Sequence, residues 1–73
     1  MIQSRVENGL FVGFDIGSEA VHYAVLNCRQ EVVYSPTPIK HFANPIAALR
    51  QAWQDICAQM EPSRIINTAF TGS

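Results

Sequence analysis

The stretch from Leu10 to Ser18 constrains this chain most strongly, because a short apolar run there ends in a carboxylate, a glycine and a hydroxyl. The run is too short and too rich in glycine for a helix, and its length is typical of a strand buried on both faces. Asp15 is therefore expected where the strand leaves the core. Gly17 permits a tight turn directly after it and lets another group approach the backbone closely.

This turn has two interpretations. In the first, its exposed N–H groups form an anion-binding nest, and Asp15 beside the nest orients a hydrated Mg²⁺. In the second, residues 15–18 form an ordinary hairpin turn with an aspartate at the strand end. A pattern this short favours the second interpretation when it is taken alone.

Composition excludes several classes of protein. The net charge of −1 and the scattered basic residues argue against a nucleic-acid surface. With 48% hydrophobic and 15% charged residues, the chain is expected to fold, and none of its apolar runs approaches the length of a membrane span. Two cysteines, Cys28 and Cys57, indicate neither a disulfide framework nor a CxxC metal site, so we expect reduced thiols and a cytoplasmic protein.

The polar residues 1–9 are predicted to form a flexible leader. Three antiparallel strands joined by short turns follow: residues 10–15, 20–26 and 31–35. Pro36 and Pro38 end the third strand, because proline lacks a backbone donor. Residues 37–43 are therefore expected to form an extended linker or an irregular edge that pairs only in part.

A helix is predicted over residues 44–60, with Asn44 as the N-cap and Pro45 in the first helical position. Apolar residues recur at spacings of three and four and predict one buried stripe: Ile46, Leu49, Trp53, Ile56 and Met60. Pro62 ends the helix, and a fourth strand follows over residues 65–70. Because the helix is a crossover, this strand is expected to lie parallel to the first.

The predicted fold class is therefore α/β, with three antiparallel strands, one crossover helix and a fourth strand parallel to the first. One helix covers only one face of such a sheet, whereas the strand over residues 10–15 is apolar on both faces. A chain of 73 residues is also marginal on its own, since it buries only about 60% of its unfolded surface. We expect the bare face to be covered by a second copy of the chain or by the remainder of a longer one.

Four short motifs follow one another along the chain: VGFDIGS at residues 12–18, Tyr34-Ser35, Asn44-Pro45 and Thr71-Gly72-Ser73. In this order they resemble the first subdomain of the actin, heat-shock and sugar-kinase ATPase superfamily, which is part of a ribonuclease H-like fold. Within it, the chain is most similar to the ATPase activators of 2-hydroxyacyl-CoA dehydratases and benzoyl-CoA reductases. The resemblance implies that residues 10–73 are the N-terminal portion of an actin-like ATPase domain.

The resemblance also implies roles for single residues. Asp15 would hold Mg²⁺ through water and be the candidate catalytic residue, while Gly17 and Ser18 with their backbone amides would contact the phosphates of ATP. Gly72 falls in the second glycine motif of the same site.

Residues 19–22, Glu-Ala-Val-His, depart from the family pattern of Thr, Thr, Thr or Ser, and Lys. Glu19 stands where the family has threonine, and a carboxylate there repels phosphate unless it turns away or binds the metal. His22 stands in place of a lysine and would substitute for it only when protonated. The alternative is that strand neighbours satisfy the His22 ring and that it has no role in binding.

The implied function is ATP hydrolysis, a phosphoryl transfer to water, that drives a CoA-ester dehydratase or reductase as the partner enzyme. ATP and Mg²⁺ are the implied cofactors, and the family's iron–sulfur ligands lie downstream of the region covered here. Two alternatives stay open: a small-molecule kinase of the same superfamily, and a non-catalytic scaffold, which His22 favours. Residues 1–73 alone are not expected to be catalytic, and neither nucleic acid nor membrane is expected as a partner.

Overall fold

The structure is a computed structural model and describes residues 8–72. The predicted leader, residues 1–9, lies outside the described residues except for Asn8 and Gly9. The elements follow in the order β1 (Leu10–Ile16), β2 (Ala20–Asn27), β3 (Val32–Tyr34), β4 (Ile39–Lys40), α2 (Pro45–Gln59), the 3₁₀ helix η1 (Pro62–Arg64) and β5 (Ile65–Gly72).

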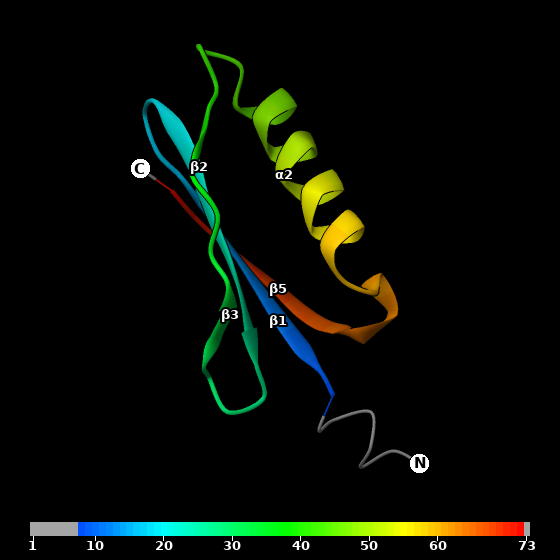
Figure 1. Cartoon of the computed structure of the whole chain (residues 1–73). Helices are drawn as coiled ribbons and strands as arrows, with labels where there is room; N and C mark the ends of the chain where they lie inside the picture. The colour runs from blue at the N-terminus through cyan, green and yellow to red at the C-terminus, as the bar shows by residue number, and fades with distance from the viewer. Residues whose placement is uncertain (1–7, 73) are drawn as a thin grey trace.

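The strands form one mixed sheet in the order β3-β2-β1-β5, with β4 paired to β2. β1 and β2 are antiparallel, whereas β5 returns parallel to β1 on the side away from β2. The α2 helix makes the crossover and lies on one face of the sheet (Figure 1). These findings confirm the predicted α/β class and the parallel fourth strand.

The segment after β3 pairs only in part, which is one of the two arrangements expected for residues 37–43. Ile39 pairs with Val21 and Lys40 with Ala20, and this two-residue strand is β4. Pro36 and Pro38 have no N–H to donate to a ladder, so pairing begins only after them.

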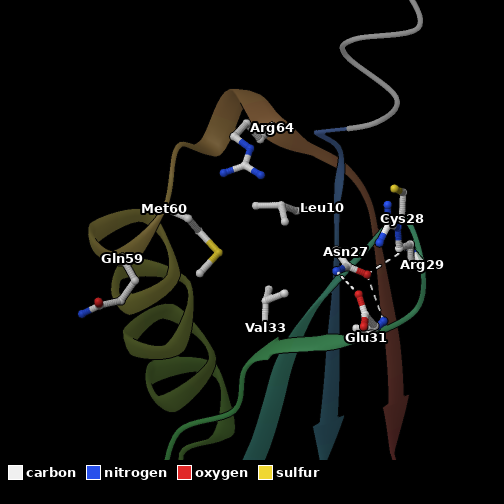
Figure 2. Close-up of a pocket in the computed structure, with 9 residues that line it drawn as sticks. All are labelled: Leu10, Asn27, Cys28, Arg29, Glu31, Val33, Gln59, Met60 and Arg64. Atoms are coloured by element: carbon white, nitrogen blue, oxygen red, sulfur yellow. Dashed lines mark hydrogen bonds between the residues drawn. The ribbon is translucent and has the colours of Figure 1, made fainter.

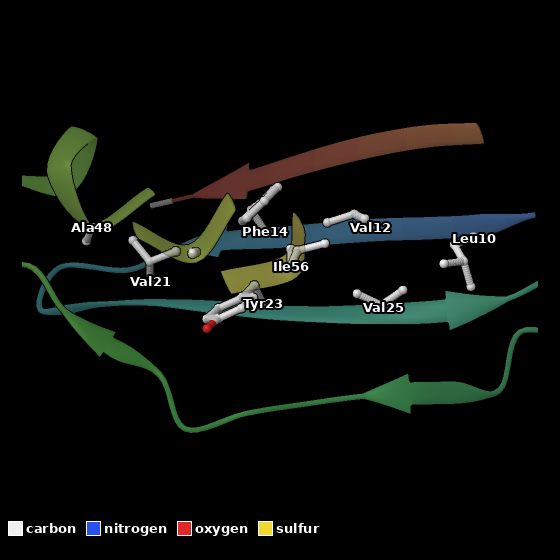
Figure 3. Packing of buried hydrophobic residues seen from close by; sticks show 9 residues of the cluster. Leu10, Val12, Phe14, Val21, Tyr23, Val25, Ala48 and Ile56 are labelled. Carbon is white, nitrogen blue, oxygen red and sulfur yellow. The ribbon is translucent and has the colours of Figure 1, made fainter. Parts of the chain in front are cut away.

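The core lies between α2 and the sheet. Alternate residues of β1 and β2 point toward the helix, and three residues of α2 meet them (Figure 3). The buried set is Leu10, Val12, Phe14, Val21, Tyr23, Val25, Ala48, Ala52 and Ile56. Each large member contributes about 1.5–3 kcal/mol to the free energy of folding.

The helix begins as predicted: Asn44 is the N-cap, its side chain accepts a hydrogen bond from the Ala47 N–H, and Pro45 follows it. The predicted buried stripe is confirmed only in part. Ile56 is buried as predicted, whereas Ile46 is 69% exposed and Trp53 is 38% exposed. Ala48 and Ala52, which were not predicted, face the core beside Ile56.

The reason for this shift is the position of the helix over β2 and β4. Small alanines bring the helix backbone close to the sheet there. The large side chains of Ile46 and Trp53 lie toward β5, beside Phe14 and Phe70. Leu49 and Met60, the other members of the predicted stripe, are half-buried.

A polar clamp holds α2 to the sheet. The hydroxyls of Tyr23 on β2 and Tyr34 on β3 both donate to Oδ2 of Asp55, each at 2.6 Å. The hydrogen bond from Tyr23, followed by that from Tyr34, lowers the pKa of the Asp55 carboxyl. Burial, followed by the bond to Asp55, raises the pKa of Tyr23. The clamp therefore favours an ionised Asp55 between two neutral tyrosines.

The opposite face of the sheet, called the open face below, carries the side chains that alternate with the buried ones on β1 and β2. Phe11, Asp15 and His22 lie on it and are exposed. No element within residues 8–72 covers this face. It is therefore the face for which the sequence predicts a cover from a second copy or from further chain.

Candidate functional site

Asp15 lies near the end of β1, on the open face, with its side chain exposed. The sheet register sets it opposite His22 of β2 on one side and Thr71 of β5 on the other. The Thr71 hydroxyl donates to Oδ1 of Asp15 at 3.1 Å. Because β1 and β5 are parallel, their carboxyl ends meet at the same end of the sheet. The motif at residues 12–18 and the motif at residues 71–73 therefore come together there at Asp15 and Thr71.

A hollow of about 310 Å³ lies on the open face beside these side chains. Its floor is made of small residues, because Gly13 pairs with Ala24 on β2 and with Ala69 on β5. A Cβ added to Gly13 would meet nothing within 4 Å. The glycine therefore leaves open space next to the Asp15 carboxylate, wide enough for atoms of a ligand.

The turn between β1 and β2 leaves part of its backbone open. The Gly17 N–H donates to the Ala20 carbonyl at 2.9 Å, so this amide is already engaged. Within the described chain, no hydrogen bond engages the N–H groups of Ser18 and Glu19. The backbone donors that the turn can offer to an anion are therefore these two.

Gly17 permits the tight turn through a close backbone approach and not through a positive φ. Its φ is not positive, and neither is that of any other described glycine. A Cβ at Gly17 would lie 3.1 Å from the Ala20 oxygen, and one at Gly72 would lie 3.2 Å from the Ile16 oxygen. Close packing across the turn explains Gly17 and close packing against β1 explains Gly72, so the case for a ligand rests on Asp15 and the two open amides.

His41 is a residue of this region that the sequence analysis missed. It is 8% exposed, and its Nε2 lies 3.0 Å from the Gly17 carbonyl oxygen. Its Nδ1 accepts a hydrogen bond from the Ala43 N–H at 3.1 Å, which assigns the proton to Nε2. His41 thus joins the turn to the connection before α2, and no motif in the sequence signals this contact.

The donor set around Asp15 fits a magnesium ion held mainly by a substrate. No cluster of three or more His, Cys, Asp or Glu side chains that could hold a metal exists among residues 8–72. Mg²⁺ commonly uses one or two carboxylates together with substrate phosphates and water. The single exposed carboxylate of Asp15 matches that pattern and does not match an all-protein cage.

A cavity of about 720 Å³ lies at the other end of the sheet, between the β2–β3 hairpin and the end of α2. In Figure 2 the Arg64 guanidinium points toward Leu10 and Met60. Arg29 and Cys28 line the hairpin side of this cavity. None of the residues predicted to bind ATP or Mg²⁺ lines it, and Cys57 lies half-buried on α2.

Comparison of the chain with protein-family models, with curated proteins and with solved structures gives no match. The resemblance to an ATPase family therefore rests on the residues of the chain alone and stays a prediction. Over residues 8–72, no helix has the length and apolar character to cross a membrane.

Proposed function

We propose that the edge of the sheet at Asp15 binds the phosphates of a magnesium–nucleotide, and that the chain is the N-terminal part of an ATP-hydrolysing activator of a CoA-ester dehydratase or reductase. The finer fold assignment, a partial ribonuclease H-like subdomain of an actin-like ATPase, belongs to this proposal. So does a cytoplasmic location. The whole protein would transfer the γ-phosphoryl group to water, with residues outside this chain completing the site.

The observation that supports the proposal best is the place of Asp15. Its carboxylate sits at the end of a central strand, is oriented by the Thr71 hydroxyl and borders an open hollow. No other hydrogen bond within the described residues uses it, so the fold does not depend on its charge. Preorganised charge at the end of a rigid strand is what electrostatic stabilisation of a phosphoryl group requires.

Each residue has a distinct part in this account. Asp15 would hold Mg²⁺ through water, and the ion would neutralise charge on the phosphates. The N–H groups of Ser18 and Glu19 would donate to phosphate oxygens, as backbone nests do. The Thr71 hydroxyl orients the Asp15 carboxylate, and the Glu19 side chain is exposed on the turn.

Calorimetric titration of the full chain with MgATP tests the proposal. Asp15→Asn should weaken binding on the order of 10–100-fold, the range found when a residue that orients a metal ligand is lost. Glu19→Gln, the matched removal of a carboxylate from the turn, should leave affinity unchanged or improve it. His22→Lys should tighten binding, because it adds a cation beside the phosphates. Equal affinities for the parent and Asp15→Asn would refute the proposal.

One observation favours the scaffold alternative. Both backbone groups of Gly17 are engaged within the protein, its N–H by Ala20 and its carbonyl by His41. A turn satisfied in this way also suits a purely structural role. Absence of MgATP binding by the parent, together with an unchanged melting temperature in Asp15→Asn, would support the scaffold.

A further inference from the structure

A second cavity, of about 330 Å³, lies beside the β1–β2 turn, between the turn and the connection from β4 to α2. It lies next to the turn but does not include Asp15. It contains one ammonium group, one hydroxyl and one carboxylate. The lining residues are Ser18, Glu19, Lys40, His41, Phe42 and Ala43.

The cavity is preformed, because the fold fixes both of its walls. His41 bonds to the Gly17 carbonyl through its ring and to the Glu19 carbonyl through its backbone N–H, at 3.0 Å each. The Asn44 N–H donates to the His41 carbonyl at 2.7 Å, which ties this wall to the start of α2. A site whose walls are held in place by hydrogen bonds within the protein loses little entropy when it binds a ligand.

The register of β4 brings Lys40 to this cavity. Lys40 pairs with Ala20, the first residue after the turn, and its neighbour Ile39 packs against the core. Successive residues of a strand point to opposite faces, so Lys40 lies on the open face, as His22 and Asp15 do. Lys40 is exposed, and no ion pair forms between it and another described residue.

We infer that this cavity receives the phosphate chain of the nucleotide bound at Asp15, with Lys40 as the cation that offsets the phosphate charge. This inference rests on the proposed function. Ser18 and Glu19 belong to the turn that directly follows β1, and they line this cavity together with Lys40. A chain of phosphates that starts at Asp15 would therefore follow the turn to reach Lys40. The Glu19 carboxylate opposes the anion and limits affinity in the absence of Mg²⁺.

Titration of the full chain with MgATP and, separately, with inorganic tripolyphosphate without metal tests the inference. Lys40→Gln should weaken both ligands by about tenfold, a typical cost for a charge-assisted contact to phosphate. Arg29→Gln removes the same charge at the other end of the sheet and should change either affinity less than twofold. Glu19→Gln should tighten tripolyphosphate binding, because it removes the opposing carboxylate.

The outcomes separate this inference from the proposed function. If Asp15→Asn weakens MgATP binding while Lys40→Gln behaves like Arg29→Gln, the inference is overturned and the proposed function stands. If MgATP does not bind but tripolyphosphate binds in a Lys40-dependent way, the cavity is an anion site and the proposed function fails. If neither ligand binds the parent, both fail.

Discussion

At the scale of single residues, the connection before α2 stores backbone strain. Phe42 and Ala43 have φ values of 47° and 66°, in the left-handed region that L residues avoid. This conformation costs about 1–2 kcal/mol per non-glycine residue. Phe42 and Ala43 keep this conformation because the His41 ring holds them in place. Its Nδ1 accepts a hydrogen bond from the Ala43 N–H, and its Nε2 contacts the Gly17 carbonyl. The strain is located where the wall of the inferred phosphate cavity is built.

Ala43→Gly should raise the free energy of unfolding by about 0.5–1 kcal/mol, because the relief of left-handed strain exceeds the extra chain entropy of glycine. Ala58→Gly, the same substitution at an exposed position of α2, should lower it by about 1 kcal/mol. Urea unfolding of the two variants measures both effects. Equal losses of stability in the two variants would contradict the strain account.

At the residue level, the sequence predicted the position of Asp15 near the end of a strand but not the contacts of His41 or the pairing of Lys40. Asp15 is signalled locally, because an aspartate that ends an apolar run marks the end of a strand. The contacts of His41 and Lys40 arise from the pairing of β4 with β2, which joins residues 20 positions apart in the chain. Pro36 and Pro38 obscure that pairing in the sequence, and a two-residue strand has no periodicity to detect.

At the scale of elements, local signals were sufficient for the helix limits and insufficient for its buried face. Asn44 and Pro45 specify the start of α2 through the geometry of their own backbone. The buried face depends on where the helix lies over the sheet. Since α2 lies over β2, Ala48 and Ala52 are buried and Trp53 is left at the edge toward β5.

The tyrosine clamp on Asp55 should make the attachment of α2 depend on pH. Folding lowers the pKa of Asp55 from its ordinary value of 3.8. The ionised carboxylate therefore stabilises the folded state above pH 3.8, and this contribution is lost as the pH falls through the lowered pKa. Asp55→Asn should be less stable than the parent at pH 7, and the difference should shrink as the pH falls below 3.8.

Tyr23→Phe should lower the free energy of unfolding by about 1 kcal/mol at pH 7, because one hydrogen bond to Asp55 is missing. Its difference from the parent should also shrink as the pH falls below 3.8. Glu61→Gln, which removes an exposed carboxylate after α2, is the control and should follow the parent at every pH. Urea unfolding between pH 2.5 and 7 provides the comparison. A difference between Asp55→Asn and the parent that is constant across this range would show that the charge of Asp55 plays no part.

At the scale of the whole molecule, the order of the strands follows from the connections, which is why it could be predicted. The short turn pairs β2 with one edge of β1, so the strand after the crossover helix takes the other edge, parallel to β1. This pairing brings Thr71 and Gly72 to the end of the sheet that carries Asp15. The open face could also be predicted, because one α-helix within residues 8–72 can cover only one face of the sheet.

Two-dimensional ¹H–¹⁵N NMR of the full chain during a titration with MgATP tests the central claim most directly, because each backbone amide reports its own surroundings. The account predicts saturable shifts at the amides of Ser18, Glu19, Lys40 and Gly72, and loss of these shifts in Asp15→Asn. The Asn27–Glu31 hairpin and Arg64, which line the large cavity at the other end, should not shift. Shifts confined to that hairpin, or no shifts at all, would contradict nucleotide binding at the Asp15 edge.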